Sequence, residues 1–223
     1  MVNGVNVAIL IDGGFFLKRY RKLFNGYGHT PQEVSKALVK MCNDHLSPKD
    51  YLYRIFYYDC LPLIKKAHNP VSKKAIDFSK SDAASFRLNF FEELKKKRKI
   101  ALRLGYLKST NNWIISPERT KALLKGIISI DDLEERDVSF QIQQKSVDMK
   151  IGLDIASLAH KERVNKIILI SGDGDFVPAA KLARREGIDF VLDPMWNNID
   201  QSLFEHIDGL KSTSPKPNNH KTK

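Results

Sequence analysis

The fold is decided by residues 166–176, which read Lys-Ile-Ile-Leu-Ile-Ser-Gly-Asp-Gly-Asp-Phe. Five residues typical of a buried strand lead directly into a turn of small residues that carries two carboxylates, and a helical pattern follows at 177–186. In an open α/β sheet, ligands lie just outside the carboxyl ends of the parallel strands. We therefore expect Asp173 and Asp175, in the turn after this strand, to contribute to a metal site.

A second strand of the same type begins the chain. Val5 to Ile11 is almost continuously apolar and rich in β-branched residues, which is typical of a strand buried on both faces of a parallel sheet. The strand ends at Asp12-Gly13-Gly14, where glycine lets the chain turn sharply without a Cβ clash, and a helix is expected from Phe15 to Leu23. Asp12 is thus a further carboxylate at the end of a predicted strand.

The remaining pattern alternates helices with strands. Thr30, Pro31 and Glu33 form a helix-start signature. The expected helices cover 31–46, 82–99, 147–161, 176–185 and 199–207, and the expected strands cover 51–58 and 188–192. Alternation at 102–106 predicts another strand, paired with 113–115 through a turn at 109–112. The pattern favours a three-layer α/β/α Rossmann-like fold with a mainly parallel sheet.

Domain organisation follows from where this pattern weakens. We expect a single domain over residues 1–210 with an insertion at about 61–140, and a disordered basic tail over 211–223.

Composition limits the cellular setting. Only two cysteines are present, Cys42 and Cys60, and neither belongs to a Cys-x-x-Cys pair, so no disulfide scaffold or zinc site is indicated. The apolar run at 5–11 is too short for a membrane span and lacks the basic leader of a signal peptide. We expect a cytoplasmic protein with no membrane partner.

Charge indicates a polyanionic partner. The chain has 37 Lys and Arg against 26 Asp and Glu, a formal charge of +11. Basic residues gather in a predicted loop and at the end of a predicted helix, where they are candidates for contacts to a phosphate backbone: Lys65, Lys66, Lys73, Lys74, Lys95, Lys96, Lys97, Arg98 and Lys99. The alternative is that these cations only keep the protein soluble or complement a helix dipole.

Four carboxylates are expected to converge, namely those of Asp12, Asp148, Asp173 and Asp175. Asp148 lies in the first turn of the helix at 147–161, beside its apolar stripe. Grouped in a half-buried cleft, these acids repel one another by roughly several kcal/mol unless a divalent cation neutralises them. Mg²⁺ or Mn²⁺ suits such oxygen ligands, and the chemistry indicated is metal-assisted phosphodiester hydrolysis.

Each acid also has a structural interpretation. Asp12 could start a turn, Asp148 could cap a helix, and Asp173 and Asp175 could bond their own turn. Asp154 lies about 9 Å further along the predicted helix than Asp148, so pairing with a nearby Lys, Arg or backbone donor is the simpler interpretation of Asp154.

Three blocks of sequence resemble the signature motifs of NYN-domain proteins, a branch of the PIN-like nucleases that includes the LabA-like bacterial proteins. The blocks are residues 11–16, 145–148 and 171–178. The resemblance covers about 5–60 and 140–208, and it implies a Mg²⁺- or Mn²⁺-dependent ribonuclease. By motif position it gives the acidic roles to Asp12, Asp148, Asp173 and Asp175, with Ser171 as a supporting hydroxyl.

This chain departs from the common form of the family at two positions. Phe15 stands where Asn is usual, and Ser146 stands where Gly is common. Loss of the Asn removes a polar group from the edge of the site, which affects substrate positioning more than metal binding.

Other functions stay open at this point. A PIN-like module that binds RNA or a protein without cutting is one alternative, and a homodimer or another protein partner fits it. A haloacid-dehalogenase-like phosphatase with Asp12 as nucleophile is another, although that class needs an acid at the position of Gly14. DNA in place of RNA is a third, because no base-stacking motif stands out in the sequence.

Overall fold

The computed structural model describes residues 4–217. The chain divides into two compact units. Unit 1 contains the described residues up to Asp59, Asn89–Gly105, and those from Ser146 onward. Unit 2 contains Cys60–Leu88 and Tyr106–Lys145.

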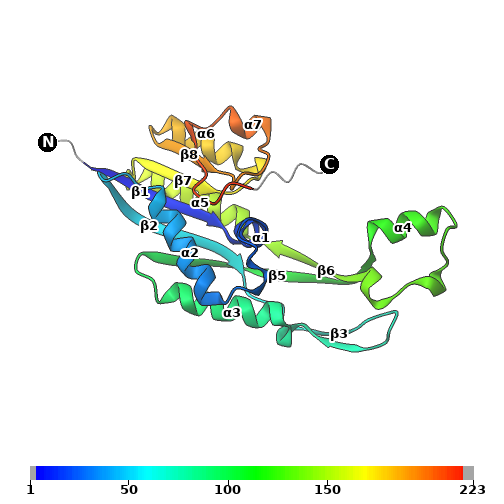
Figure 1. The fold of residues 1–223 in the computed structure, drawn as a ribbon. Helices are drawn as coiled ribbons and strands as arrows, with labels where there is room; N and C mark the ends of the chain where they lie inside the picture. Colours follow the sequence, from blue (N-terminus) through cyan, green and yellow to red (C-terminus); the bar gives the residue numbers. More distant parts are fainter. Residues whose placement is uncertain (1–3, 218–223) are drawn as a thin grey trace. The chain divides into compact units, whose positions relative to one another are not determined.

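Unit 1 is built on a mostly parallel sheet flanked by helices (Figure 1). Its strand order is β5-β2-β1-β7-β8-β9. The strands are β1(Val5–Asp12), β2(Asp50–Cys60), β5(Ile100–Ile115), β7(Lys166–Ile170), β8(Asp189–Asp193) and β9(Gly209–Leu210). The helices are α1(Gly13–Leu23), α2(Pro31–Asp44), α3(Asp82–Lys95), α5(Val147–His160), α6(Val177–Arg185) and α7(Gln201–Phe204). The predicted fold class, a Rossmann-like α/β fold, is confirmed.

The centre of the sheet is β1, which pairs in parallel with β2 and β7. Residues Val7 to Ile11 have no exposed surface, as expected for a strand covered on both faces. In register, Ile11 lies opposite Tyr57 and Ile170, so β1, β2 and β7 end at the same edge. The turns after these strands are therefore neighbours, and these turns carry the candidate acids.

Gly13 lets α1 begin directly against β2. A Cβ at this position would lie 2.5 Å from the Tyr58 carbonyl oxygen and 2.6 Å from the Tyr57 ring. The glycine is needed for space, and its close contact fixes Asp12 at the end of the strand.

A buried polar contact ties the end of α2 to the end of β8. His45 follows α2, and its Nε2 lies 2.9 Å from Asp193 Oδ2 with both side chains fully buried. Asp193 also accepts a hydrogen bond from the Met195 amide at 2.7 Å.

The segment after β9 is also held in unit 1. The Thr213 hydroxyl donates to the Met41 carbonyl at 3.1 Å, and Trp196 Nε1 donates to the Ser214 carbonyl at 2.9 Å. Residues 211–214 are thus packed in place, where we had expected a disordered tail, because these polar residues find partners on α2 and after β8. The tail predicted for 218–223 lies outside the described residues.

Unit 2 contains a hairpin of β3(Lys66–His68) and β4(Ala75–Asp77), the 3-10 helix η2(Phe78–Lys80), the start of α3, the distal half of β5, α4(Pro117–Leu124), two short 3-10 helices and β6(Val138–Lys145). Our prediction of two strands joined by a turn at 109–112 is wrong. Residues 100–115 form one strand, which pairs antiparallel with β6. The register is irregular between Ser109 and Trp113, and Asn111 adopts φ 64°. Asn tolerates this left-handed conformation, so the turn-like sequence forms a bulge in the strand.

Among residues 4–217, no helix is both long enough and apolar enough to cross a bilayer.

Replacing Gly13 with Ala tests the close packing of α1 on β2. We expect Gly13→Ala to lower the free energy of unfolding by about 1–3 kcal/mol, because the added methyl overlaps backbone and ring atoms that cannot easily move. Gly152→Ala is the matched control, since a Cβ there meets nothing within 4 Å and lies in α5. It should stabilise the protein by about 0.5–1 kcal/mol through helix propensity. Urea unfolding measures both, and equal effects would contradict this account of Gly13.

Candidate functional site

Asp12 lies at the boundary between β1 and α1 and caps the helix. Its Oδ1 accepts a hydrogen bond from the Phe15 amide at 3.0 Å. The net pKa of Asp12 is raised to about 6. Burial is the largest cause, and the charges of Asp148 and Asp59 also raise the pKa, while hydrogen bonds from the Phe15 and Gly14 amides lower it. The carboxylate is therefore held in place in surroundings that disfavour its charge.

Asp148 comes from the first turn of α5 and is exposed. Its pKa is raised by desolvation and then by the charges of Asp173 and Asp175. Ser146, the N-cap residue of α5, has φ 71°, a left-handed conformation that glycine adopts without strain. This turn directs the chain from β6 into α5, where Asp148 interacts electrostatically with acids from two other segments.

Asp173 and Asp175 lie in the turn between β7 and α6. Asp173 Oδ1 accepts from the Asp175 amide at 3.0 Å, and the buried Ser171 hydroxyl accepts from the Asp173 amide at 3.4 Å. The turn-bonding role that we considered for Asp173 is thus observed. Asp12, for which we considered a turn-starting role, caps α1. These bonds occupy only part of each carboxylate and keep it at the strand-end edge.

The four acids come from three separate segments and interact electrostatically. Asp148 interacts with Asp12, with Asp173 and with Asp175. Within residues 4–217, however, no three acid, His or Cys side chains stand close enough together to hold an ion. The donor chemistry fits Mg²⁺ or Mn²⁺, because the groups are carboxylates whose repulsion a divalent cation would relieve. Asp148, Asp173 and Asp175 are exposed, which leaves their side chains room to change rotamer.

Two further acids adjoin this edge. Asp59, at the end of β2, is fully buried and raises the pKa of Asp12. The Asp200 carboxylate lies beside the acidic turn, since a Cβ on Gly174 would be 3.5 Å from its Oδ2. The position of Asp59 after a strand could be seen in the sequence, whereas Asp200 reads there only as the cap of a short helix.

The Phe15 ring lies against the acidic turn. A Cβ on Gly172 would be 2.8 Å from Phe15 Cε2 and 3.3 Å from Asn197 Nδ2. The residue that replaces the usual Asn therefore covers the Gly172 backbone, and an amide from the segment after β8 lies next to it.

Asp154 has structural partners. The Tyr58 hydroxyl donates to its Oδ2 at 2.8 Å, and Arg103 Nε donates to the same oxygen at 2.9 Å. These contacts agree with our interpretation of Asp154 as a partner for a nearby cation.

The candidate phosphate-binding cations have varied surroundings. Lys65 bonds Ser109 and Asn111, Lys73 bonds the Pro70 carbonyl, and Lys74 pairs with Glu135. Lys95 and Lys96 pair with Glu92 and Glu93, and Lys99 bonds the Leu52 carbonyl above the Tyr51 ring. Their role in binding nucleic acid stays a prediction.

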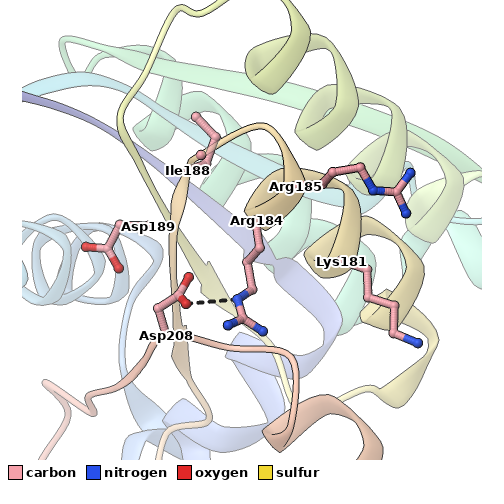
Figure 2. A pocket seen from close by; sticks show the side chains of 7 residues that line it. Lys181, Arg184, Arg185, Ile188, Asp189 and Asp208 are labelled. Atoms are coloured by element: carbon pink, nitrogen blue, oxygen red, sulfur yellow. Dashed lines mark hydrogen bonds and ion pairs between the residues drawn. The ribbon is translucent and has the colours of Figure 1, made fainter.

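A basic pocket of about 620 Å³ lies at the end of α6 away from the acidic turn. Figure 2 shows Arg184 pointing toward Asp208, with which it forms an ion pair of 2.8 Å, while Lys181 and Arg185 extend away from that carboxylate. This pocket could not be inferred from the sequence, because its residues read as an ordinary helix end.

The pKa of Asp12 predicts a pH-dependent effect of Asp12→Asn in metal-free protein. The folded-state pKa, about 6, lies above the ordinary value of 3.8, so the folded form binds the proton more tightly. The stability contributed by Asp12 is present below pH 4 and is lost as the pH rises toward 6. We therefore expect Asn, which still accepts from Phe15, to raise the free energy of unfolding by about 1–3 kcal/mol at pH 7.5 and to change it little at pH 4.

Urea unfolding in EDTA measures this effect. Asp44→Asn, at an exposed surface pair, is the control and should show little change at either pH. A gain from Asp12→Asn that is equal at both pH values would contradict the assigned cause.

Comparison with known proteins adds two findings. A crystal structure of a protein of unknown function from Vibrio parahaemolyticus RIMD 2210633 is similar to this chain, with a TM-score of 0.50 and 14% identity, over 95% of this chain and 94% of that one. At this identity the similarity concerns the fold alone. No curated protein matches the chain.

The family model described as NYN domain matches residues 76–201, more than half of the 223 residues. The match contains Asp148, Asp173 and Asp175 and leaves Asp12 outside. It also runs through much of the segment that we treated as an insertion. Asp12 is connected to the other acids by its position at the strand-end edge. The chain belongs to the NYN domain family, within the PIN-like nuclease superfamily.

Proposed function

We propose that this chain is a Mg²⁺- or Mn²⁺-dependent ribonuclease. The observation that carries the proposal is the electrostatic coupling of Asp148 to Asp12, Asp173 and Asp175 at the strand-end edge. Acids that raise one another's pKa at an exposed edge are costly unless they serve to bind a cation. Membership of a family of nucleases supports hydrolysis of a nucleic acid.

The proposal gives metal binding to the four acids and their orientation to backbone amides and the Ser171 hydroxyl. Asp12, Asp148, Asp173 and Asp175 would hold the ion. A bound Mg²⁺ or Mn²⁺ would activate water and stabilise charge on the phosphoryl oxygens. The Phe15 and Asp175 amides fix one oxygen of Asp12 and of Asp173, and the Ser171 hydroxyl accepts from the Asp173 amide. These bonds prepare two carboxylates for binding before substrate arrives.

A binding module without cleavage is the second candidate. Two observations favour it: the Phe15 ring covers Gly172, and no three acids of residues 4–217 stand at ligand spacing. The phosphatase alternative has less support, because Gly14 offers no acid to a nucleophilic Asp12.

Cleavage of end-labelled single-stranded RNA tests the proposal. We expect cleavage with Mn²⁺ or Mg²⁺ and none in EDTA, and we expect Asp148→Asn to lower the rate at least about 100-fold, because it removes a carboxylate that interacts with the other three. Asp44→Asn should cleave at the wild-type rate. Single-stranded DNA of the same sequence shows whether the 2′-hydroxyl matters.

Metal binding is measured separately by the melting temperature. Mn²⁺ should raise the melting temperature of the wild type and raise that of Asp148→Asn less. Intact RNA in the presence of Mn²⁺, with RNA binding retained, would favour the binding module instead. A phosphorylated Asp12 trapped from a phosphate ester would favour the phosphatase.

A further inference from the structure

Three aromatic rings of unit 2 surround one pocket of about 630 Å³. Phe78 comes from η2, Trp113 from β5 and Phe140 from β6. Phe78 and Phe140 stack with ring centroids 5.0 Å apart, and Trp113 meets Phe140 edge-on at 5.3 Å. Each of the three side chains is partly exposed, so the pocket presents aromatic surface to solvent.

A few polar groups border this aromatic surface. Lys65 Nζ lies 5.5 Å from the centroid of the Phe140 ring. The polar lining residues are Asn69, Glu135, Arg136 and Ser139. Asn69 accepts from the Val71 and Ser72 amides and donates to the Glu135 carbonyl. An apolar pocket with a small number of fixed polar groups is suited to a flat ring with a polar edge.

The neighbouring hairpin supplies positive charge. Lys66 lies on β3, and Lys73 and Lys74 lie in the turn before β4, with all three side chains exposed. Lys74 also forms a 2.9 Å surface ion pair with Glu135, which a phosphate would have to replace. Lys73 has φ 62°, and its Nζ is 2.7 Å from the Pro70 carbonyl. Stacking surface beside exposed cations is the combination with which proteins bind single-stranded nucleic acid.

The degree of burial separates these rings from the core aromatics. Phe16, Phe90 and Phe176 of unit 1 are at most 2% exposed, as packing side chains are. Phe78, Trp113 and Phe140 are partly exposed instead, so part of their aromatic surface is available to another ring.

We propose that the pocket formed by Phe78, Trp113 and Phe140 binds an unpaired nucleobase of single-stranded RNA, with Lys66, Lys73 and Lys74 near the adjacent phosphates. The choice of RNA as the polymer rests on the proposed function. Duplex RNA cannot offer such a base, because its bases are stacked and paired.

RNA binding by the whole 223-residue chain in EDTA, where no cleavage is expected, tests this inference. The probes are a fluorescent 12-nucleotide oligouridine, an RNA duplex of equal length, and a ribose-phosphate 12-mer that lacks bases. We expect the duplex and the baseless strand to bind at least about 5-fold more weakly than oligouridine. Phe140→Leu should weaken oligouridine binding about 5- to 50-fold, whereas Phe140→Tyr, which keeps the ring, should stay within about 2-fold of the wild type.

Tryptophan fluorescence gives a second measurement. The chain has two tryptophans, Trp113 and Trp196, so Trp196→Phe leaves Trp113 as the only reporter. Oligouridine should quench its emission, and the baseless strand should not. Tyr27→Leu, which removes a ring that is 79% exposed and outside unit 2, is the control and should bind as the wild type does.

Two results would overturn the inference. One is wild-type affinity in Phe140→Leu at an unchanged melting temperature, and the other is equal binding of oligouridine and the baseless strand, which would leave the pocket to a protein ligand. Both are independent of the cleavage assay. Base-dependent binding without metal-dependent cleavage would retain the pocket and reject the nuclease, and cleavage with base-independent binding would do the reverse.

Discussion

Repulsion between carboxylates at the end of the sheet is the constraint on which the rest of the site depends. These acids belong to segments far apart in the sequence, yet Asp148 raises the pKa of Asp12, and Asp173 and Asp175 raise the pKa of Asp148. Bringing them together lowers the stability of the metal-free fold. A cation would relieve that repulsion, so folding and metal binding are expected to be thermodynamically linked.

The fold resists this repulsion through tight packing behind the edge. The residues of β1 between Val7 and Ile11 are completely buried, and α1 begins in contact with β2 because Gly13 has no side chain. The buried His45–Asp193 contact joins α2 to the end of β8. Asp12 and Asp173 use backbone amides of their own turns as partners, so these carboxylates are oriented without a neighbouring cation.

The sequence predicted those parts of the structure that follow from local pattern. Continuous apolar runs identified β1 and β7, and the strand ends placed Asp12, Asp173 and Asp175 at one edge. Pairing of Asp154 with a cation followed from its offset along α5, and the structure supplies Arg103 as the partner. The position of Asp200 beside the acidic turn could not be predicted, because its approach to Gly174 depends on how the segment after β8 folds back.

Contacts between residues far apart in the sequence account for most differences between the predicted and the observed structure. The partner of β5 is β6, more than 20 residues away, and Ser109 to Asn112 form a bulge although their composition is that of a turn. The aromatic pocket has the same origin: Phe78, Trp113 and Phe140 are separated by 27 residues or more and show no shared period. Residues 211–214 looked disordered in composition, but their backbone and hydroxyl groups find partners in unit 1.

We expect these acids to form one coupled group that binds a divalent cation. Carbon-13 NMR of the aspartate carboxyl groups, titrated in EDTA and again with Mg²⁺, measures this coupling directly. We expect a pKa of about 6 for Asp12 in EDTA, a lower value in Asp148→Asn, and a still lower value when Mg²⁺ saturates the wild type. A pKa of Asp12 that neither Asp148→Asn nor Mg²⁺ changes would show that the acids are not coupled.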